Sequence, residues 1–134
     1  MKKPKGIKPH YFIINSGPYK NDIFVCVNYN VKQVEKMFTK YKCPPLSLEA
    51  IEHIEEKKEG SALYLYHSDK QHRTILLWPR NNNEMITSFD HEKVHLLYDV
   101  MNTVGMPLCS ETEEAFAYLS EFLMQQFLEK VKWL

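Results

Sequence analysis

Two strong helix signals in the last third of the chain, separated by the breaker Gly105-Met106-Pro107, constrain the fold more than any other feature. The first predicts a helix with its N-cap at Ser88 or Asp90 and its last residue at Val104, since glycine readily takes the left-handed conformation that ends helices. The second predicts a helix over 111–132. The apolar side chains expected to face the core are Val94, Leu97, Met101 and Val104 in the first helix, and Phe116, Leu119, Phe122, Leu123, Phe127 and Leu128 in the second.

The first half of the chain reads as short strands and helices in turn. Its strand signals are runs of β-branched and aromatic residues bounded by turn residues, and its helix signals are apolar residues at helical spacing. A small sheet of about four strands beside several helices is an α+β domain. The expected strands are 11–15, 22–27, 62–66 and 74–78, the last two forming a hairpin, and the expected helices are 31–41 and 47–60.

Composition limits the classes of protein to which the chain can belong. Its 134 residues suit one domain with a single core. The 17 basic and 17 acidic side chains leave a net charge of zero, which argues against a nucleic-acid-binding surface. Apolar runs are too short to cross a membrane, and three cysteines without C-x-x-C spacing argue against a disulfide framework. We expect a cytoplasmic protein with a flexible N-terminus over 1–10, strands and two helices over 11–80, and two long helices over 88–132.

His91 and His95 belong to the motif H-E-x-x-H, near the start of the first long helix. Residues four apart lie about 40° apart around a helix axis, so both imidazoles can reach one metal ion. Two histidine ligands from one rigid helix suit Zn²⁺. Glu92 is rotated by about 100° from His91, so we expect it to accept a proton from water rather than bind the metal. The motif predicts a zinc site with Glu92 as the catalytic base.

The third ligand of a hydrolytic zinc site is expected from the start of the second long helix. Ser110 and Glu113 fit the S-x-x-E capping box, which leaves Glu114 free to face the metal. Glu111 is explained as a first-turn residue that the helix dipole favours. Cys109 is a rival ligand because thiolate binds zinc well, and a buried structural cysteine is its other interpretation. Among the remaining histidines, His67 at a strand end is the one whose distance from the metal matters most.

These residues resemble the gluzincin branch of the zincin-like metallopeptidases, in which H-E-x-x-H is followed by a glutamate on the next helix. The run Glu114-Ala-x-Ala-Tyr118-Leu119 is similar to small zincin-like proteins of tailed bacteriophages, and to the E-A-x-x-F-A helix of ImmA/IrrE-type peptidases. The resemblance covers about 88–128. It implies a minimal zincin-like domain with Glu114 as third zinc ligand. Tyr118 stands where several gluzincins have an acidic residue, and it can hydrogen-bond a ligand or the developing oxyanion, or simply pack.

The resemblance implies a zinc-dependent metallopeptidase acting on a protein or peptide, with Glu92 passing a proton from water to the leaving amine. It also implies that the strand 73–78 pairs with an extended substrate peptide by strand addition. The alternative is a non-catalytic phage accessory or virion protein that keeps the fold and binds a host or viral protein, in the host cytoplasm. The intact Glu92 favours the enzyme, whereas the small size of the domain favours the binding protein.

Overall fold

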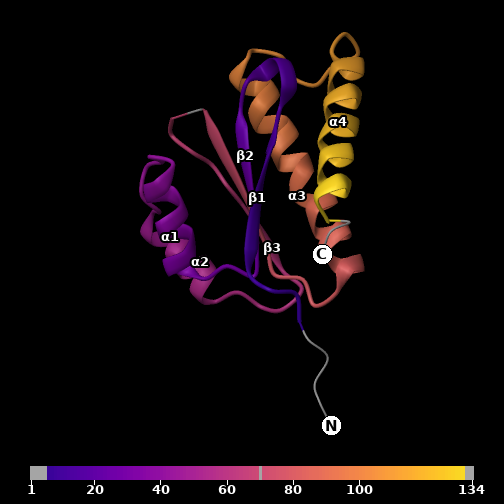
Figure 1. The fold of residues 1–134 in the computed structure, drawn as a ribbon. Coiled ribbons are helices and arrows are strands. Elements are labelled where there is room, and N and C mark those ends of the chain that lie inside the picture. Colours follow the sequence, from indigo (N-terminus) through magenta and orange to yellow (C-terminus); the bar gives the residue numbers. More distant parts are fainter. Residues whose placement is uncertain (1–5, 70, 132–134) are drawn as a thin grey trace.

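The computed structural model describes residues 6–69 and 71–131, so half of the expected flexible N-terminus, 1–5, lies outside the described residues. A four-stranded sheet is covered on one face by α1 and α2 and on the other by α3 and α4 (Figure 1). This is the small α+β domain that the sequence predicts. The elements are β1 (His10–Asn15), a 3₁₀ turn (Gly17–Tyr19), β2 (Asp22–Val27), α1 (Val31–Lys40), α2 (Leu48–Glu55), β3 (Ala62–Leu65), β4 (His72–Leu77), α3 (Asn82–Thr103) and α4 (Glu113–Val131).

The strands lie in the order β1-β2-β4-β3. The expected hairpin is confirmed, because β3 pairs antiparallel with β4. β1 and β2, which were predicted as strands without a stated pairing, form a second antiparallel pair. β2 and β4 pair in parallel at the centre, so the chain crosses over between them through α1, α2 and β3. Since β4 is paired on both sides, the predicted strand addition of a peptide to 73–78 is wrong. In the part of the chain that the structure describes, β1 and β3 are the edge strands of the sheet.

Successive side chains of the two central strands alternate between two cores, as the period of a strand requires. On the α3/α4 face, Val25 and Ile75 pack with residues of both long helices. On the other face, Cys26 and Leu76 pack with α1 and α2. β2 therefore reads as an apolar run over 23–27 and β4 as a shorter one over 75–77, which is typical of strands buried on both sides.

A β-bulge at Gly60 precedes β3, where the chain begins to pair with β4. The N–H of Gly60 donates to the carbonyl of Trp78, and the N–H of Trp78 donates to the carbonyl of Ser61. Two residues thus face one, with Gly60 at φ 86°, which is the G1 type of bulge that glycine permits. α2 ends at Glu55, five residues before this glycine, so the predicted helix end at Gly60 is wrong. Its predicted N-cap, Ser47, is confirmed by a 3.1 Å hydrogen bond from the Ala50 N–H.

α3 begins at Asn82, well before the predicted N-caps at Ser88 and Asp90. The side chain of Asn81 accepts the N–H of Glu84 at 2.9 Å and is the actual N-cap, a role that asparagine fills well. The asparagine run 81–83 therefore opens the helix. The helix ends as expected, because Gly105 follows it with a φ of 75°.

The core-facing stripe of α3 differs from the predicted one. Leu97 and Met101 are buried as expected, but Val94 and Val104 are 48% and 45% exposed. Phe89 lies within the buried side of the helix, and Val94 lies outside it. The residues that occupy the stripe are Met85, Phe89, Glu92, Lys93, Leu96, Leu97, Val100 and Met101. The catalytic candidate Glu92 is therefore one of the side chains that α3 turns inward.

α4 begins at Glu113, so the predicted capping box of Ser110 with Glu113 is wrong. The first helical bond of α4 runs from the Phe116 N–H to the carbonyl of Thr112, and the Thr112 hydroxyl is held by the carbonyl of Pro107 at 2.6 Å. Glu113 thus lies in the first turn beside Glu114. Four of the six predicted inward residues are buried: Phe116, Leu119, Leu123 and Phe127, whereas Phe122 and Leu128 are 37% and 44% exposed.

Candidate metal site

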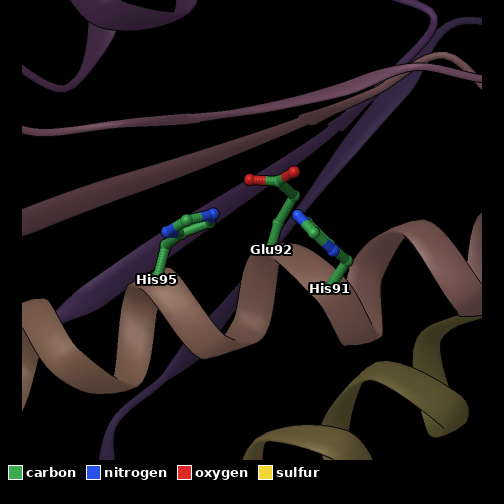
Figure 2. A group of neighbouring side chains, drawn as sticks. All are labelled: His91, Glu92 and His95. Carbon is green, nitrogen blue, oxygen red and sulfur yellow. The ribbon is translucent and has the colours of Figure 1, made fainter.

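His91, Glu92 and His95 each offer a metal-ligating atom, and these three atoms lie within 4.8 Å of one another. All three side chains project from the same side of α3, towards the strands, with the Glu92 carboxylate above and between the imidazoles (Figure 2). The imidazole centroids are 5.5 Å apart at an interplanar angle of 66°. The helical spacing of the motif therefore brings the two imidazoles together, and Glu92, which was expected to lie outside the coordination, offers an oxygen to the same group.

The three residues differ in their exposure to solvent. Both histidines are exposed, whereas Glu92 is only 7% exposed. Burial raises the pKa of the Glu92 carboxyl above its ordinary value, and the neighbouring His95 and His91 act in the opposite direction. A carboxylate deprived of water is a stronger proton acceptor than a solvated one. The group thus combines two accessible nitrogen donors with one poorly solvated base.

The sequence could have indicated the burial of Glu92. It lies three residues after Phe89 and four before Leu96, which is the spacing of one helix face, and both of these residues are fully buried. The predicted helix began too late for Phe89 to count as part of the stripe. With the true start of α3, Glu92 is a polar residue inserted into an apolar face.

The β3 edge forms the other wall of the site. Gly60 and Ala62 line an open hollow of about 360 Å³ together with Thr87, His91 and Glu92. Further along β3, the ring of Tyr64 lies 6.4 Å from the imidazole of His95, centroid to centroid, at an interplanar angle of 25°. The histidines therefore line a crevice between α3 and the free edge of the sheet. A larger groove of about 480 Å³ lies between β3 and α2, and neither histidine of the motif lines it.

The structure does not bring Glu114 to the histidines. Among the residues that the structure describes, Glu114 is not part of the ligand group, and its side chain is exposed. α4 packs against a different side of α3, where Phe127 stacks on Phe89 at 3.9 Å. In Figure 2, α4 lies below α3 while the three side chains point upwards to the strands. The ligand role of Glu114 remains a prediction that this arrangement does not support.

The remaining sequence candidates also lie apart from the group. Tyr118 is 68% exposed on α4. Cys109 is exposed, which contradicts the interpretation as a buried cysteine, and its Sγ lies 3.5 Å from the Thr112 hydroxyl. His67 hydrogen-bonds the Thr74 hydroxyl at 2.7 Å and lies against Phe38, on the α1/α2 face of the sheet. None of these three belongs to the ligand group that the described residues form.

A buried polar network beside the site was missed by the sequence analysis. Arg73 of β4 is 1% exposed, and its Nε lies 2.7 Å from Oδ2 of Asp99 on α3. The hydroxyl of Tyr64 donates to the same carboxylate oxygen at 2.5 Å. Asp99 stands one helical turn after His95, so the network adjoins the histidines. Only the pairing of β3 and β4 with this helix brings the three residues together, and no local spacing signals it.

The donor set could hold a metal ion. Imidazole nitrogen and carboxylate oxygen are both common zinc ligands, and the two exposed histidines are accessible to an ion from solvent.

Comparisons of the chain with protein-family models, curated proteins and solved structures found no match. No helix among the described residues is long and apolar enough to span a membrane.

Proposed function

We propose that the protein is a zinc-dependent hydrolase, and that its substrate bond is a peptide bond. The observation that carries this proposal is the convergence of the His91, Glu92 and His95 donor atoms within 4.8 Å of one another. A metal site that does not use Glu92 as a ligand has no structural need for a desolvated base beside two ligand imidazoles. The resemblance of the motif to zincin-like peptidases supports the same reaction class.

Each residue of the group has a distinct task in this proposal. His91 and His95 hold the ion through one imidazole nitrogen each, from adjacent turns of one helix. A bound Zn²⁺ supplies Lewis acidity, polarising the substrate carbonyl and making water easier to deprotonate. Glu92 accepts the proton from water and returns it to the leaving amine. Burial of Glu92 limits the hydration of its carboxylate, which raises the pKa of this group and makes it a better proton acceptor.

The free edge of β3 offers a place for an extended peptide. The bond from Trp78 to Ser61 shows that Ser61 directs its carbonyl towards β4. Because bonded and non-bonded pairs alternate along an antiparallel ladder, the main-chain groups of Ala62 and Tyr64 point outwards. These are the residues of β3 closest to the motif. The proposed strand addition therefore moves from the interior strand β4 to the edge strand β3.

The position of Glu114 favours a second candidate function. With two histidines and Glu92 as the only converging ligands among the described residues, the ion can use Glu92 itself as a ligand. Such a site would stabilise the domain without supplying a base. The protein would then be a metal-stabilised binding module that acts on a protein partner without turnover.

Glu92→Gln distinguishes the two candidates. Glutamine keeps the shape of the side chain but cannot accept a proton at neutral pH. In a hydrolase, zinc content stays near that of the parent protein and turnover of a peptide library falls about 10²- to 10⁴-fold. His95→Ala should lose zinc and activity together, and His53→Ala, which alters an exposed histidine on α2, serves as the matched control.

Each result of the zinc and cleavage measurements supports or contradicts a particular candidate function. A parent protein that binds no zinc would contradict both candidates. Loss of zinc in Glu92→Gln, with the fold retained, would make Glu92 a ligand and favour the binding module. Retained zinc with undiminished cleavage would mean that Glu92 is not the base.

A further inference from the structure

We propose that Tyr64 is a positioning residue for the ligand His95, and that Asp99 and Arg73 lock Tyr64 in place. This inference rests on the proposed metal site and adds to it the residues that orient one of its ligands. The residues concerned lie on the side of the site that faces β3 and β4. None of them belongs to the H-E-x-x-H motif.

The first link is the bond between Tyr64 and Asp99. Tyr64 is 6% exposed, and its hydroxyl donates to Asp99 Oδ2 at 2.5 Å. A charge-assisted bond to a carboxylate is short and strong, and inside a protein it is costly to break. Burial, and then the bond to Asp99, raise the pKa of the Tyr64 phenol, which therefore remains a donor. The tyrosine is thus tied to α3 one turn beyond His95.

The second link fixes Asp99 from the opposite direction. Arg73 Nε lies 2.7 Å from Asp99 Oδ2 as an ion pair, although its N–H is not aligned for a hydrogen bond. Arg73 is itself held, because Nη1 donates to the carbonyl of His72 at 2.9 Å and Nη2 donates to the Thr103 hydroxyl at 3.2 Å. The Thr103 hydroxyl donates in turn to the carbonyl of Asp99 at 2.8 Å. The Asp99 carboxylate is therefore held by Arg73 as well as by Tyr64.

The third link is the contact of the ring with His95. The two ring centroids are 6.4 Å apart at 25°, within the range of interacting aromatic pairs. The ring of Tyr66 packs edge-on against that of Tyr64, with centroids 4.8 Å apart and an interplanar angle of 89°, so Tyr64 is in contact with a second aromatic ring. The phenol ring is therefore a fixed wall beside an otherwise exposed imidazole. Such a wall restricts the rotamers of His95 before a metal arrives, which is how surrounding residues raise the affinity of a site.

A purely structural role for the network makes a different prediction. Tyr64 also belongs to the core between the sheet and the two long helices, so its loss must lower the stability of the fold. If stability were all that Tyr64 provides, zinc affinity would remain unchanged in any variant that still folds. Zinc affinity and the stability of the zinc-free protein therefore have to be measured separately.

The experiment compares Tyr64→Leu, Tyr64→Phe and Phe127→Leu with the parent protein. Phe127 stacks on Phe89 at 3.9 Å in the same core, so its truncation destabilises the fold away from His95. Zinc affinity is measured by competition with a chelating indicator, and stability by urea denaturation of zinc-free protein. Tyr64→Leu removes the wall and should bind zinc about 10- to 100-fold more weakly. Tyr64→Phe keeps the ring but loses the bond to Asp99, so its loss should be smaller.

The expected pattern is weaker zinc binding in both Tyr64 variants, in the order Leu then Phe, with parental affinity in Phe127→Leu. Parental zinc affinity in a folded Tyr64→Phe and Tyr64→Leu pair would overturn the inference while leaving the metal site intact. If Tyr64→Leu does not fold, parental affinity in Tyr64→Phe alone overturns it. Absence of zinc binding in the parent protein would instead refute the proposed function, and the inference with it.

Discussion

The side-chain amide of Gln126 pairs with both main-chain groups of Asn15. Gln126 Oε1 accepts the Asn15 N–H at 3.1 Å, and Gln126 Nε2 donates to the Asn15 carbonyl at 2.8 Å. The amide thus takes the place of a neighbouring strand at the end of β1, which is an edge of the sheet. It also ties α4 to the sheet at a point where the helix carries few charges. A free strand edge is prone to pair with other chains, and this contact covers part of one.

We expect Gln126→Ala to lower the free energy of unfolding by about 1 kcal/mol, because two partly exposed hydrogen bonds to the main chain are lost. Gln125→Ala is the matched control, since Gln125 is the same residue type on the same helix with its side chain in solvent. Urea denaturation of the three proteins measures the difference. Equal stability of the two variants would show that the Asn15 contact contributes nothing.

Local patterns predicted the helices and strands of this fold, but not which distant elements pair or pack with one another. The strand and turn residues of β3 and β4 predicted a hairpin, because it is a contact between consecutive segments, whereas β1 and β2 were predicted as strands without a stated pairing. The parallel pairing of β2 with β4 joins residues about fifty positions apart, such as Val25 and Ile75. No spacing in the sequence encodes such a pair. The mistaken strand addition to 73–78 follows directly from this gap.

The candidate site shows the same division. His91 and His95 were predicted to converge because they lie one helical turn apart, and that geometry depends only on the helix. The position of Glu114 depends on how α4 packs against α3, and its predicted approach was built on a capping box that does not form. The contact of Tyr64 and Asp99 joins a strand edge to a helix 35 positions away. Periodicity is silent on both packing arrangements, and the resemblance implied an approach of Glu114 to the histidines that the structure does not show.

Zinc should stabilise the fold by an amount that grows with the logarithm of its free concentration above Kd. An ion that binds only the folded chain raises the free energy of unfolding by about 2.7 kcal/mol when its free concentration is 100 times Kd. We expect the thermal midpoint of zinc-free protein to rise on addition of zinc and to return on addition of a chelator. His91→Ala should show no such rise, and an equal rise in that variant would place the zinc elsewhere.

Glu113 and Glu114 provide a test of the third ligand. Both lie in the first turn of α4, where the helix dipole favours acidic residues by about 0.3–1 kcal/mol, so Glu113→Gln and Glu114→Gln should lose similar small amounts of stability. Because the structure holds Glu114 apart from the histidines, we expect both variants to keep zinc affinity within about twofold of the parent, well short of the 10-fold or larger loss typical of disturbed sites. Zinc titration of the pair gives the answer. A selective loss in Glu114→Gln would restore the ligand role implied by the resemblance and require α4 to move on metal binding.

His67 should make the fold sensitive to acid. Burial lowers the pKa of His67 to about 4, from an ordinary value near 6.5. Between these values the unfolded chain binds a proton that the folded chain refuses, so stability falls as pH falls from 7 towards 4. We expect His67→Gln, which can still bond Thr74 but has no proton to gain, to lose about 1–2 kcal/mol less than the parent protein between pH 7.5 and pH 5. Urea denaturation of both proteins at the two pH values measures this difference, in which the contributions of the other titrating groups cancel. Parallel losses in the two proteins would mean that His67 titrates in the folded state as it does in the unfolded chain.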